Sequence, residues 1–281
     1  MITKKLIRVR IQHLLRSARL LSLADRARYY IKVCILRKRN NKFIAENPGY
    51  ALPPSYLAFD AYSSSHWEFY KVSGEQTVPF LKKITDKYFS GDHKLSSIFE
   101  WCCGPARITR QMPLVFKDAD IHASDYNVRT IEWCQRHIPG VEFIKNELGP
   151  PLPFPDEKFD FIYAISVFTH LSESNCLAWA CELHRLIKPV GILLITTDSD
   201  SVYQKEFLPG EKKTYDTKGI VVKGQYEEGK KMYLTRHSPA YIRGKLLQPF
   251  EILEHVPEVF PFMKQDYWIA RKRGDWSHER K

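Results

Sequence analysis

The stretch Ile98-Phe99-Glu100-Trp101-Cys102-Cys103-Gly104-Pro105-Ala106-Arg107 decides the fold of this chain. An apolar, strand-like run that begins at Leu95 ends at Trp101, and a turn of small residues then leads into a helix-like segment at 108–110. Small residues let a ligand approach the backbone, and the N-terminus of a helix favours negative charge. Open α/β sheets bind nucleotide-like ligands in this way, beyond the carboxyl ends of their strands.

Strand-like and helix-like segments alternate on both sides of this stretch. Strands are expected at 95–101, 121–124, 141–144, 159–165, 192–197, 250–253 and 267–270. Helices are expected at 77–89, 131–137, 172–187 and 238–247, and an insertion or hairpin at 203–233. Strands that alternate with helices at this spacing indicate βαβ units and a mostly parallel sheet.

The positive charge of the chain is concentrated at its N-terminus. The net charge is +11, and residues 1–43 hold thirteen Lys or Arg against one acid, Asp25, so the rest of the chain is close to neutral. The basic character therefore belongs to an extension and not to the enzyme-like body. Because the motifs begin only at Glu100, we expect removal of residues 1–43 to leave the ligand site intact.

Two amphipathic helices are predicted within this extension. The first runs from Leu6 to Leu21 with apolar residues on one stripe and arginines on the other side, and the second covers 24–38. These helices could pack on the body with a solvated basic face, or dock on anionic lipid or on RNA phosphate. Lipid is favoured over RNA, because the extension lacks the aromatics and glycines of an RNA-binding module.

Composition indicates a protein of a reducing compartment. The longest apolar runs are too short to span a bilayer, no signal peptide is evident, and six cysteines lack disulfide-like regularity. We expect a cytoplasmic protein, peripheral at the inner face of the membrane if the extension binds lipid. Cys176, Cys181 and His184 share one predicted helix at a spacing that matches no zinc pattern, so core packing and no metal is expected there.

The quoted stretch resembles motif I of the class I S-adenosylmethionine-dependent methyltransferases, in its Gly-Cys-Gly-Pro-Gly-Arg form. Glu100 takes the acidic position, Gly104 the central glycine and Arg107 the trailing arginine. Cys102 and Ala106 stand where the family has glycine. Both are small, so we expect the turn to keep its shape.

Three later landmarks strengthen this resemblance. Asp125, at the end of the second strand, fits the carboxylate that accepts both ribose hydroxyls, and Asn146, after the third strand, fits the residue that binds adenine. The segments 159–171 and 186–191 resemble the fourth-strand region and the Leu-Lys-Pro-Gly-Gly turn before the fifth strand. The resemblance implies S-adenosylmethionine as cofactor, held by Glu100, Cys102, Gly104, Asp125, Tyr126, Asn146 and Ile165.

Histidines and aromatics outside the motifs are candidates for acceptor binding and catalysis. In related methyltransferases the segment before the first strand folds over the cofactor as a lid, which suggests Tyr62, Trp67 and Tyr70 as lid residues, although residues 59–70 also fit a loop packed by its own rings. Arg236 is a further candidate for the acceptor side. A hydroxyl acceptor needs a general base, and His170, after the fourth strand, is the first candidate. His66 and His237 are alternatives, and a hydrogen-bonded structural histidine is the other interpretation of His170.

The sequence thus predicts a Rossmann-like methyltransferase sandwich with a seven-stranded, mostly parallel sheet and a basic helical extension. The extension covers 1–46 and the methyltransferase domain 47–281, divided into lid and lead-in helix (47–94), cofactor-binding core (95–200), and substrate-side insertion with closing strands (201–281). A dehydrogenase is disfavoured, because only Gly104 is available for its glycine motif.

The expected function is O-methylation of a sugar or glycan hydroxyl, since the chain is similar to bacterial methyltransferases associated with surface-glycan synthesis. A small-molecule or lipid-linked acceptor, a non-catalytic scaffold, and an RNA methyltransferase remain alternatives. The near-neutral body and the absence of an Asn/Asp-Pro-Pro-Tyr motif after the fourth strand argue against a nucleic-acid partner. An anionic membrane surface is the expected partner of residues 1–43.

Overall fold

A seven-stranded sheet forms the centre of the molecule, a computed structural model that describes residues 4–89, 94–203, 207–274 and 276. Across the sheet the strands follow the order β3 (Glu142–Lys145), β2 (Asp120–Asp125), β1 (Ser97–Trp101), β4 (Phe159–Ala164), β5 (Ile187–Asp198), β9 (Gln265–Lys272) and β8 (Phe250–Val256). The first five in this order are parallel, and β9 is antiparallel to both of its neighbours. The predicted fold, with one antiparallel strand near the end, is confirmed.

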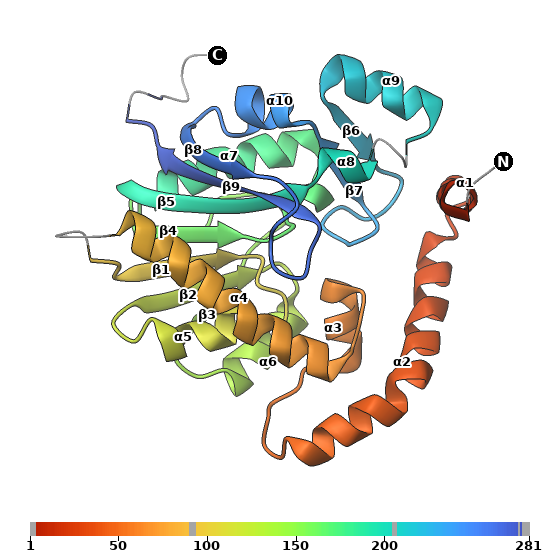
Figure 1. Cartoon of the computed structure of the whole chain (residues 1–281), viewed down its shortest axis with the longest axis horizontal. Coiled ribbons are helices and arrows are strands. Elements are labelled where there is room, and N and C mark those ends of the chain that lie inside the picture. Colours follow the sequence, from red (N-terminus) through yellow and green to blue (C-terminus); the bar gives the residue numbers. More distant parts are fainter. Residues whose placement is uncertain (1–3, 90–93, 204–206, 275, 277–281) are drawn as a thin grey trace.

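Different helices cover the two faces of the sheet (Figure 1). One face carries α4 (Trp67–Tyr88), α5 (Met112–Val115) and α6 (Val128–His137), and the other carries α7 (Glu173–Leu186), α10 (Pro239–Tyr241) and the π-helical turn Ile242–Leu246. In β1, Ile98 packs beneath α4 while its neighbour Phe99 packs toward α7. Because both faces are buried, the strands are almost continuously apolar, which is why the sequence pattern reveals them.

The segment predicted as an insertion or hairpin contains both a helix and a hairpin. The remaining elements are α3 (Ser55–Tyr62), α8 (Asp200–Tyr203), α9 (Pro209–Lys218), β6 (Ile220–Lys223), β7 (Leu234–His237) and the 3₁₀ turns Thr109–Gln111 and Phe168–His170. β6 and β7 pair as an antiparallel hairpin separate from the main sheet. The loop between β6 and β7 contacts the turn after β4, since the Gly229 amide donates to the His170 carbonyl at 2.9 Å.

Residues 59–70 are largely helical, which corrects the prediction of a loop. α3 ends at Tyr62, where Ser63 adopts a left-handed conformation, and α4 begins at Trp67, ten residues before the predicted start. Gly74 is a poor helix former and lies before the predicted start at 77, so the first half of α4 has no clear helical pattern in the sequence. Burial of Trp67 and Tyr70 supplies the packing that holds it.

Gly74 lets α4 approach the turn that follows β1. A Cβ atom at this position would lie 2.0 Å from the carbonyl oxygen of Arg107. We predict that Gly74→Ala destabilises the protein by about 1–3 kcal/mol, because overpacking against backbone outweighs the roughly 1 kcal/mol better helix propensity of alanine. Urea unfolding measures the effect. The matched control is Gly210→Ala in α9, where nothing lies within 4 Å of the added atom. Equal stability of the two variants would contradict the prediction.

The N-terminal extension consists of α1 (Lys4–Ser17) and α2 (Leu21–Glu46), which run along one side of the molecule (Figure 1). The stripe predicted from Leu6 to Leu21 is divided, because the chain turns at Arg19, whose φ is 57°. Arg16 fixes α1 to the hairpin: its guanidinium donates to the carbonyls of Lys223 (2.6 Å), Gly224 (2.5 Å) and Met232 (2.7 Å).

One face of α2 packs on the body. Lys32 donates to the Ser63 carbonyl at 2.8 Å, Asn40 donates to the Ser65 carbonyl at 2.8 Å, and Phe43 is buried against α3 and α4. No helix in the described ranges is both long enough and apolar enough to span a bilayer. α2 ends at Glu46, and the predicted division of the chain into domains stays a prediction.

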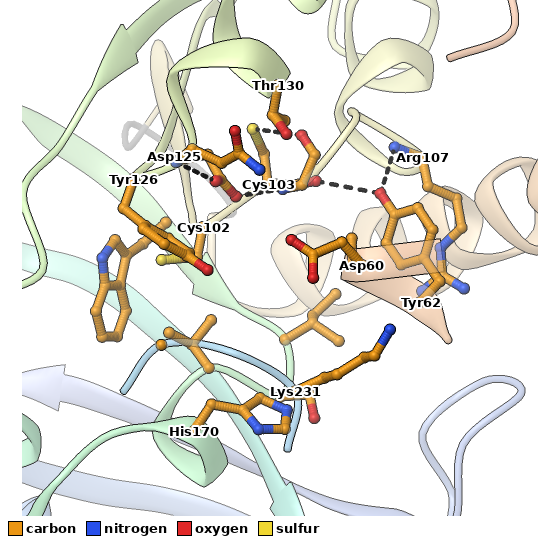
Figure 2. Close-up of a pocket in the computed structure, with 18 of the residues that line it drawn as sticks. Asp60, Tyr62, Cys102, Cys103, Arg107, Asp125, Tyr126, Thr130, His170 and Lys231 are labelled. Carbon is orange, nitrogen blue, oxygen red and sulfur yellow. Dashed lines mark hydrogen bonds between the residues drawn. The ribbon is translucent and has the colours of Figure 1, made fainter. Parts of the chain in front are cut away.

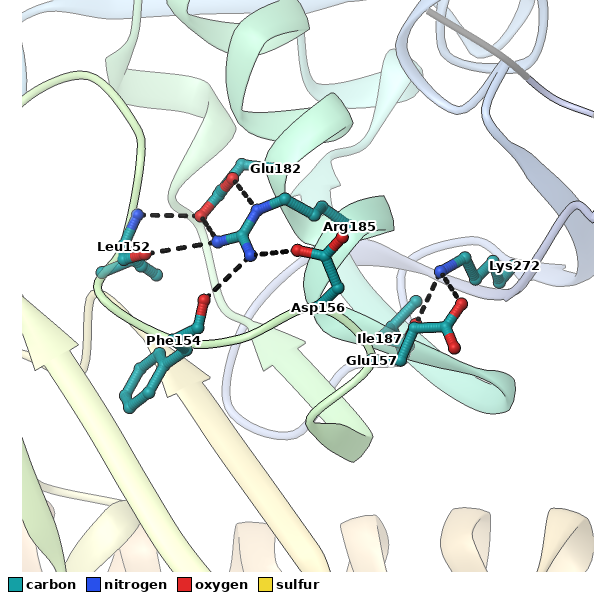
Figure 3. A network of polar contacts seen from close by, with 8 residues as sticks. All are labelled: Leu152, Phe154, Asp156, Glu157, Glu182, Arg185, Ile187 and Lys272. Carbon is teal, nitrogen blue, oxygen red and sulfur yellow. Dashed lines mark hydrogen bonds and ion pairs between the residues drawn. The ribbon is translucent and has the colours of Figure 1, made fainter.

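A buried polar network holds the proline-rich loop that follows β3 (Figure 3). Arg185 of α7 donates to the carbonyls of Leu152 (3.2 Å) and Phe154 (2.8 Å) and pairs with Glu182 at 2.6 Å. Glu182 in turn accepts the Leu152 amide at 2.8 Å. Because this loop begins at Asn146, the network fixes one wall of the site described next.

Candidate cofactor and acceptor site

A cavity of about 430 Å³ opens at the carboxyl ends of β1, β2 and β4. The seven residues predicted to bind the cofactor all line it: Glu100, Cys102, Gly104, Asp125, Tyr126, Asn146 and Ile165. They come from the ends of four neighbouring parallel strands, β3, β2, β1 and β4, and from the loops that follow, so one edge of the sheet brings them together. Their individual contacts with a cofactor stay predictions.

The turn after β1 keeps the backbone shape of a glycine-rich turn although Cys102 and Ala106 replace two of its three glycines. Cys102, Gly104 and Ala106 all have positive φ, at 60°, 55° and 53°. This left-handed conformation costs a non-glycine residue about 1–2 kcal/mol. Tyr62 of α3 covers the turn, because its hydroxyl accepts the Arg107 amide at 3.2 Å and lies 3.4 Å from the Cys103 carbonyl. The expectation that small replacements preserve the turn agrees with this geometry.

Asp125 connects the first two strands through its carboxylate. Its Oδ2 accepts the Gly104 amide at 2.9 Å and its Oδ1 accepts the Asn127 amide at 2.8 Å. Each carboxylate oxygen can accept a second hydrogen bond, so both can still receive a ribose hydroxyl. Burial raises the pKa of Asp125 to about 6, although the two amide hydrogen bonds oppose the shift.

Glu100 presents a second buried carboxylate to the cavity. Its Oε2 accepts hydrogen bonds from the hydroxyls of Thr109 and, at 2.7 Å, Tyr163. Burial raises the pKa of Glu100 to about 7, and these two hydrogen bonds lower it only in part. Glu100 lines the cavity, and an ionised carboxylate there suits an ammonium group of a ligand.

The raised pKa of Glu100 predicts a pH-dependent cofactor affinity. A ligand that places its ammonium group at Glu100 binds the ionised carboxylate more tightly, so binding lowers the pKa of Glu100 below its free value of about 7. Affinity should therefore fall as pH drops from 7.5 to 6, by up to about tenfold per pH unit. Calorimetry with S-adenosylhomocysteine across this range measures the slope. Glu100→Gln should flatten it, and an unchanged slope in that variant would assign the titration to another group.

Asn146 offers an unused acceptor at the far end of the cavity. The residue is buried, its side-chain Nδ2 donates to the Glu147 carbonyl at 2.6 Å, and its Oδ1 has no hydrogen-bond partner among the described residues. An orphaned buried acceptor in a cavity wall is costly unless a ligand fills it, and the exocyclic amine of adenine is a donor of the right kind. The two acids, the open turn and this acceptor fit S-adenosylmethionine.

His170 lies on the opposite side of the cavity from the turn (Figure 2). Its Nδ1 is 2.9 Å from the carbonyl oxygen of Tyr233. A carbonyl can only accept, so Nδ1 carries the proton, and a neutral ring then leaves Nε2 as the basic atom. Burial lowers the pKa of His170, and this outweighs the opposing hydrogen bond to Tyr233. The imidazole is therefore neutral at pH 7.

Five predicted acceptor-side residues lie outside the cavity lining. His66 is at the start of α4, with its Nε2 3.9 Å from Glu68, and His237 is buried in β7, where burial lowers its pKa to about 3. Trp67 and Tyr70 are buried in the core of α4, and Arg236 pairs with Asp198. Their positions in and next to α4 and in the β6–β7 hairpin direct these side chains away from the cavity. Among the predicted lid residues only Tyr62 lines it.

The prediction that Cys176 packs in the core agrees with its position. Cys176 is fully buried, and its Sγ lies 3.8 Å from His237 Nε2. In the described ranges no three His, Cys, Asp or Glu side chains gather as a metal site.

Two ion pairs that the sequence did not reveal separate this cavity from a second one. Asp60 of α3 pairs with Lys230 at 3.1 Å, and Asp25 of α2 pairs with Lys231 at 2.9 Å. The second cavity, of about 540 Å³, shares Asp60, Tyr126, Asn127, Lys230 and Lys231 with the first. Asp25 thus pairs with a lysine that lines the cavity, so the extension contacts the wall of the site. The expectation that removal of residues 1–43 leaves the ligand site intact stays a prediction.

Comparison with known proteins agrees with this geometry. Residues 98–191, about a third of the chain, match the family model described as a methyltransferase domain. A protein from Pyrococcus horikoshii has a TM-score of 0.51 and 15% identity over 83% of this chain and 99% of that one. An S-adenosylmethionine-dependent methyltransferase from Clostridium acetobutylicum has a TM-score of 0.52 and 11% sequence identity, over 71% of this chain and 92% of that one. An S-adenosylmethionine-dependent methyltransferase from Methanosarcina mazei has a TM-score of 0.50 and 20% sequence identity, over 67% of this chain and 96% of that one.

At identities this low the structural likeness shows the fold alone, so the enzyme class depends on the matched domain. The chain carries a methyltransferase domain, and that domain contains Glu100, Gly104, Asp125 and Asn146. The predicted class, an S-adenosylmethionine-dependent methyltransferase, and the predicted cofactor are confirmed. The acceptor is a separate question.

Proposed function

We propose that this methyltransferase transfers its methyl group to a hydroxyl of a sugar or glycan. The observation that carries the proposal is the neutral imidazole of His170, which lines the cavity with its Nδ1 proton held by the Tyr233 carbonyl. A hydroxyl is a weak nucleophile and needs a base for its proton more than a neutral amine does. The fixed tautomer leaves Nε2 to supply that base.

In this mechanism the residues of the chain hold and orient the reactants. Bound S-adenosylmethionine supplies a methyl group on a positively charged sulfur. Glu100 and Asp125 hold the cationic ligand from one side of the cavity. His170 Nε2 accepts the hydroxyl proton, and the hydrogen bond from Nδ1–H to the Tyr233 carbonyl stabilises the imidazolium that results.

The second cavity supports an extended polar acceptor. Its walls include the aromatic rings Tyr29, Tyr56, Phe59 and Tyr126, onto which the apolar faces of sugar rings can stack. Lysines and aspartates on the shared wall can bind ring hydroxyls. A hydroxyl in the first cavity can thus belong to a molecule whose remainder occupies the second. Lipid-linked and small-molecule acceptors of the same chemistry are further outcomes of the test.

The test is methyl transfer from methyl-labelled S-adenosylmethionine to a panel of methyl glycosides and nucleotide sugars. The expected product carries its label as a methyl ether, which survives mild alkali, whereas a methyl ester does not. Alkali-labile label, or transfer to amines alone, would contradict a hydroxyl acceptor. Calorimetry with S-adenosylhomocysteine separates a further case: a protein that does not bind it at all is a scaffold and not an enzyme.

A further inference from the structure

The outward face of α2 carries an apolar stripe that no described residue covers. Leu23, Tyr30, Ile31 and Ile35 fall on one side of the helix, since at 100° per residue they lie within about 140° of its circumference. All four are exposed, Leu23 to 63% and Ile35 to 71%. Exposed apolar residues that occur singly need no explanation, but a row of this kind marks an interaction site.

The neighbouring helix adds to the same apolar character. In α1, Ile11 is 51% exposed and Leu14 is 67% exposed. Arg16, by contrast, is buried on the carbonyls of the hairpin and is not available to a partner. Among the side chains of the extension that the structure describes, α2 holds more exposed large apolar residues than α1.

Positive charge lies beside the apolar stripe on α2. At 100° per residue, Arg26 and Arg37 fall on one flank of the stripe and Arg39 on the other, while Lys38 lies at its C-terminal end. All four side chains are exposed. An apolar stripe between cationic flanks is the pattern of helices that lie in the interface of an anionic membrane.

The opposite face of α2 is already occupied, so the stripe is held in place. Lys32, Asn40 and Phe43 fix that face to α3 and α4, and Arg16 anchors the preceding helix. Binding at the outer face therefore needs no refolding of the extension. A partner meets a surface that is ordered in advance, which reduces the entropy lost on binding.

We propose that the outer face of α2 docks on the surface of an anionic lipid bilayer, with the helix lying parallel to the membrane plane. A second copy of this chain is a poorer occupant, because two such faces in contact would bring their cationic flanks together. The proposal does not depend on which acceptor is methylated.

Vesicle sedimentation tests the proposal on the full chain. Wild type should sediment with vesicles of phosphatidylcholine and phosphatidylglycerol but not with pure phosphatidylcholine, and high salt should weaken the binding because it screens the charges. Ile31→Glu/Ile35→Glu should lower the partition coefficient at least about tenfold, since two apolar side chains no longer enter the interface. The matched control is Leu114→Glu in α5, since Leu114 is 67% exposed, between Ile31 at 59% and Ile35 at 71%, but lies outside the extension.

Three results would overturn the proposal. Equal binding to neutral and anionic vesicles would show that charge plays no part. An equal loss of vesicle binding in Leu114→Glu would show that the stripe on α2 plays no part. A wild-type dimer in sedimentation velocity that Ile31→Glu/Ile35→Glu converts to a monomer would assign the face to a second copy. Circular dichroism and calorimetry with S-adenosylhomocysteine establish that the double variant is folded, so that lost binding reports on the surface itself.

Discussion

His170→Gln should slow methyl transfer to the acceptor by about 10²–10⁴-fold, the range expected when a general base is removed. Glutamine keeps a polar side chain of similar reach but cannot take the hydroxyl proton. Affinity for S-adenosylhomocysteine should stay nearly unchanged, because His170 lies on the other side of the cavity from Glu100 and Asp125. Single-turnover kinetics separate the chemical step from binding and release.

The pH profile provides a second measure of the same role. Burial lowers the pKa of His170, so the imidazole is the active base at neutral pH and the rate should fall only as pH drops through that lowered value, below 6.5. His66→Gln is the matched control, since His66 lies outside the cavity lining and should retain the native rate. If His170→Gln also retained it, the histidine would be a structural residue that fixes the loop at Tyr233.

Asp125→Ala should weaken binding of S-adenosylhomocysteine by about 1.5–3 kcal/mol, the range for hydrogen bonds to a charged group. It should also lower the free energy of unfolding, because the amides of Gly104 and Asn127 lose the carboxylate that accepts them. Asp125→Asn keeps one acceptor oxygen and should recover part of both losses. Calorimetry and urea unfolding measure the two effects separately.

Asp120→Ala provides the control for this measurement. Asp120 begins the same strand, β2, but its side chain is exposed and lies outside the cavity lining. Its removal should change neither affinity nor stability by more than about 0.5 kcal/mol. Unchanged affinity in Asp125→Ala would mean that the ribose is held elsewhere.

Features within one strand and its following loop were predictable from the sequence. The ends of β1, β2 and β4 must share one edge of a parallel sheet, so Glu100, Asp125 and Ile165 could be assigned to one site without knowledge of the packing. The turn at Cys102 and Ala106 was predictable for a related reason. Small side chains at alternate positions suffice for the backbone conformation, although a search for glycines alone would have missed it.

Features that depend on contacts between distant segments could not be predicted. Asp60 and Lys230 are 170 residues apart in the chain, and nothing in their local sequences distinguishes them from other surface charges. The orientation of His237 could not be predicted for the same reason, because the pairing of β7 with β6 decides which face of β7 is buried. Trp67 and Tyr70 were assigned to a lid because their residue types suit one. Both are instead buried in a cluster with Phe43 of α2 and Ala58 of α3, which only the fold brings to α4.

The hold of Arg16 on the hairpin has a consequence for the order of events during synthesis. Its carbonyl partners lie 207, 208 and 216 residues further along the chain. At about 5–20 residues per second, the ribosome needs roughly 10–40 s after Arg16 to produce them. Throughout that interval the carbonyl groups that will anchor α1 have not yet been synthesised. α1 is therefore made well before the hairpin that anchors it, and a nascent chain would present this helix to its surroundings before the sheet is complete.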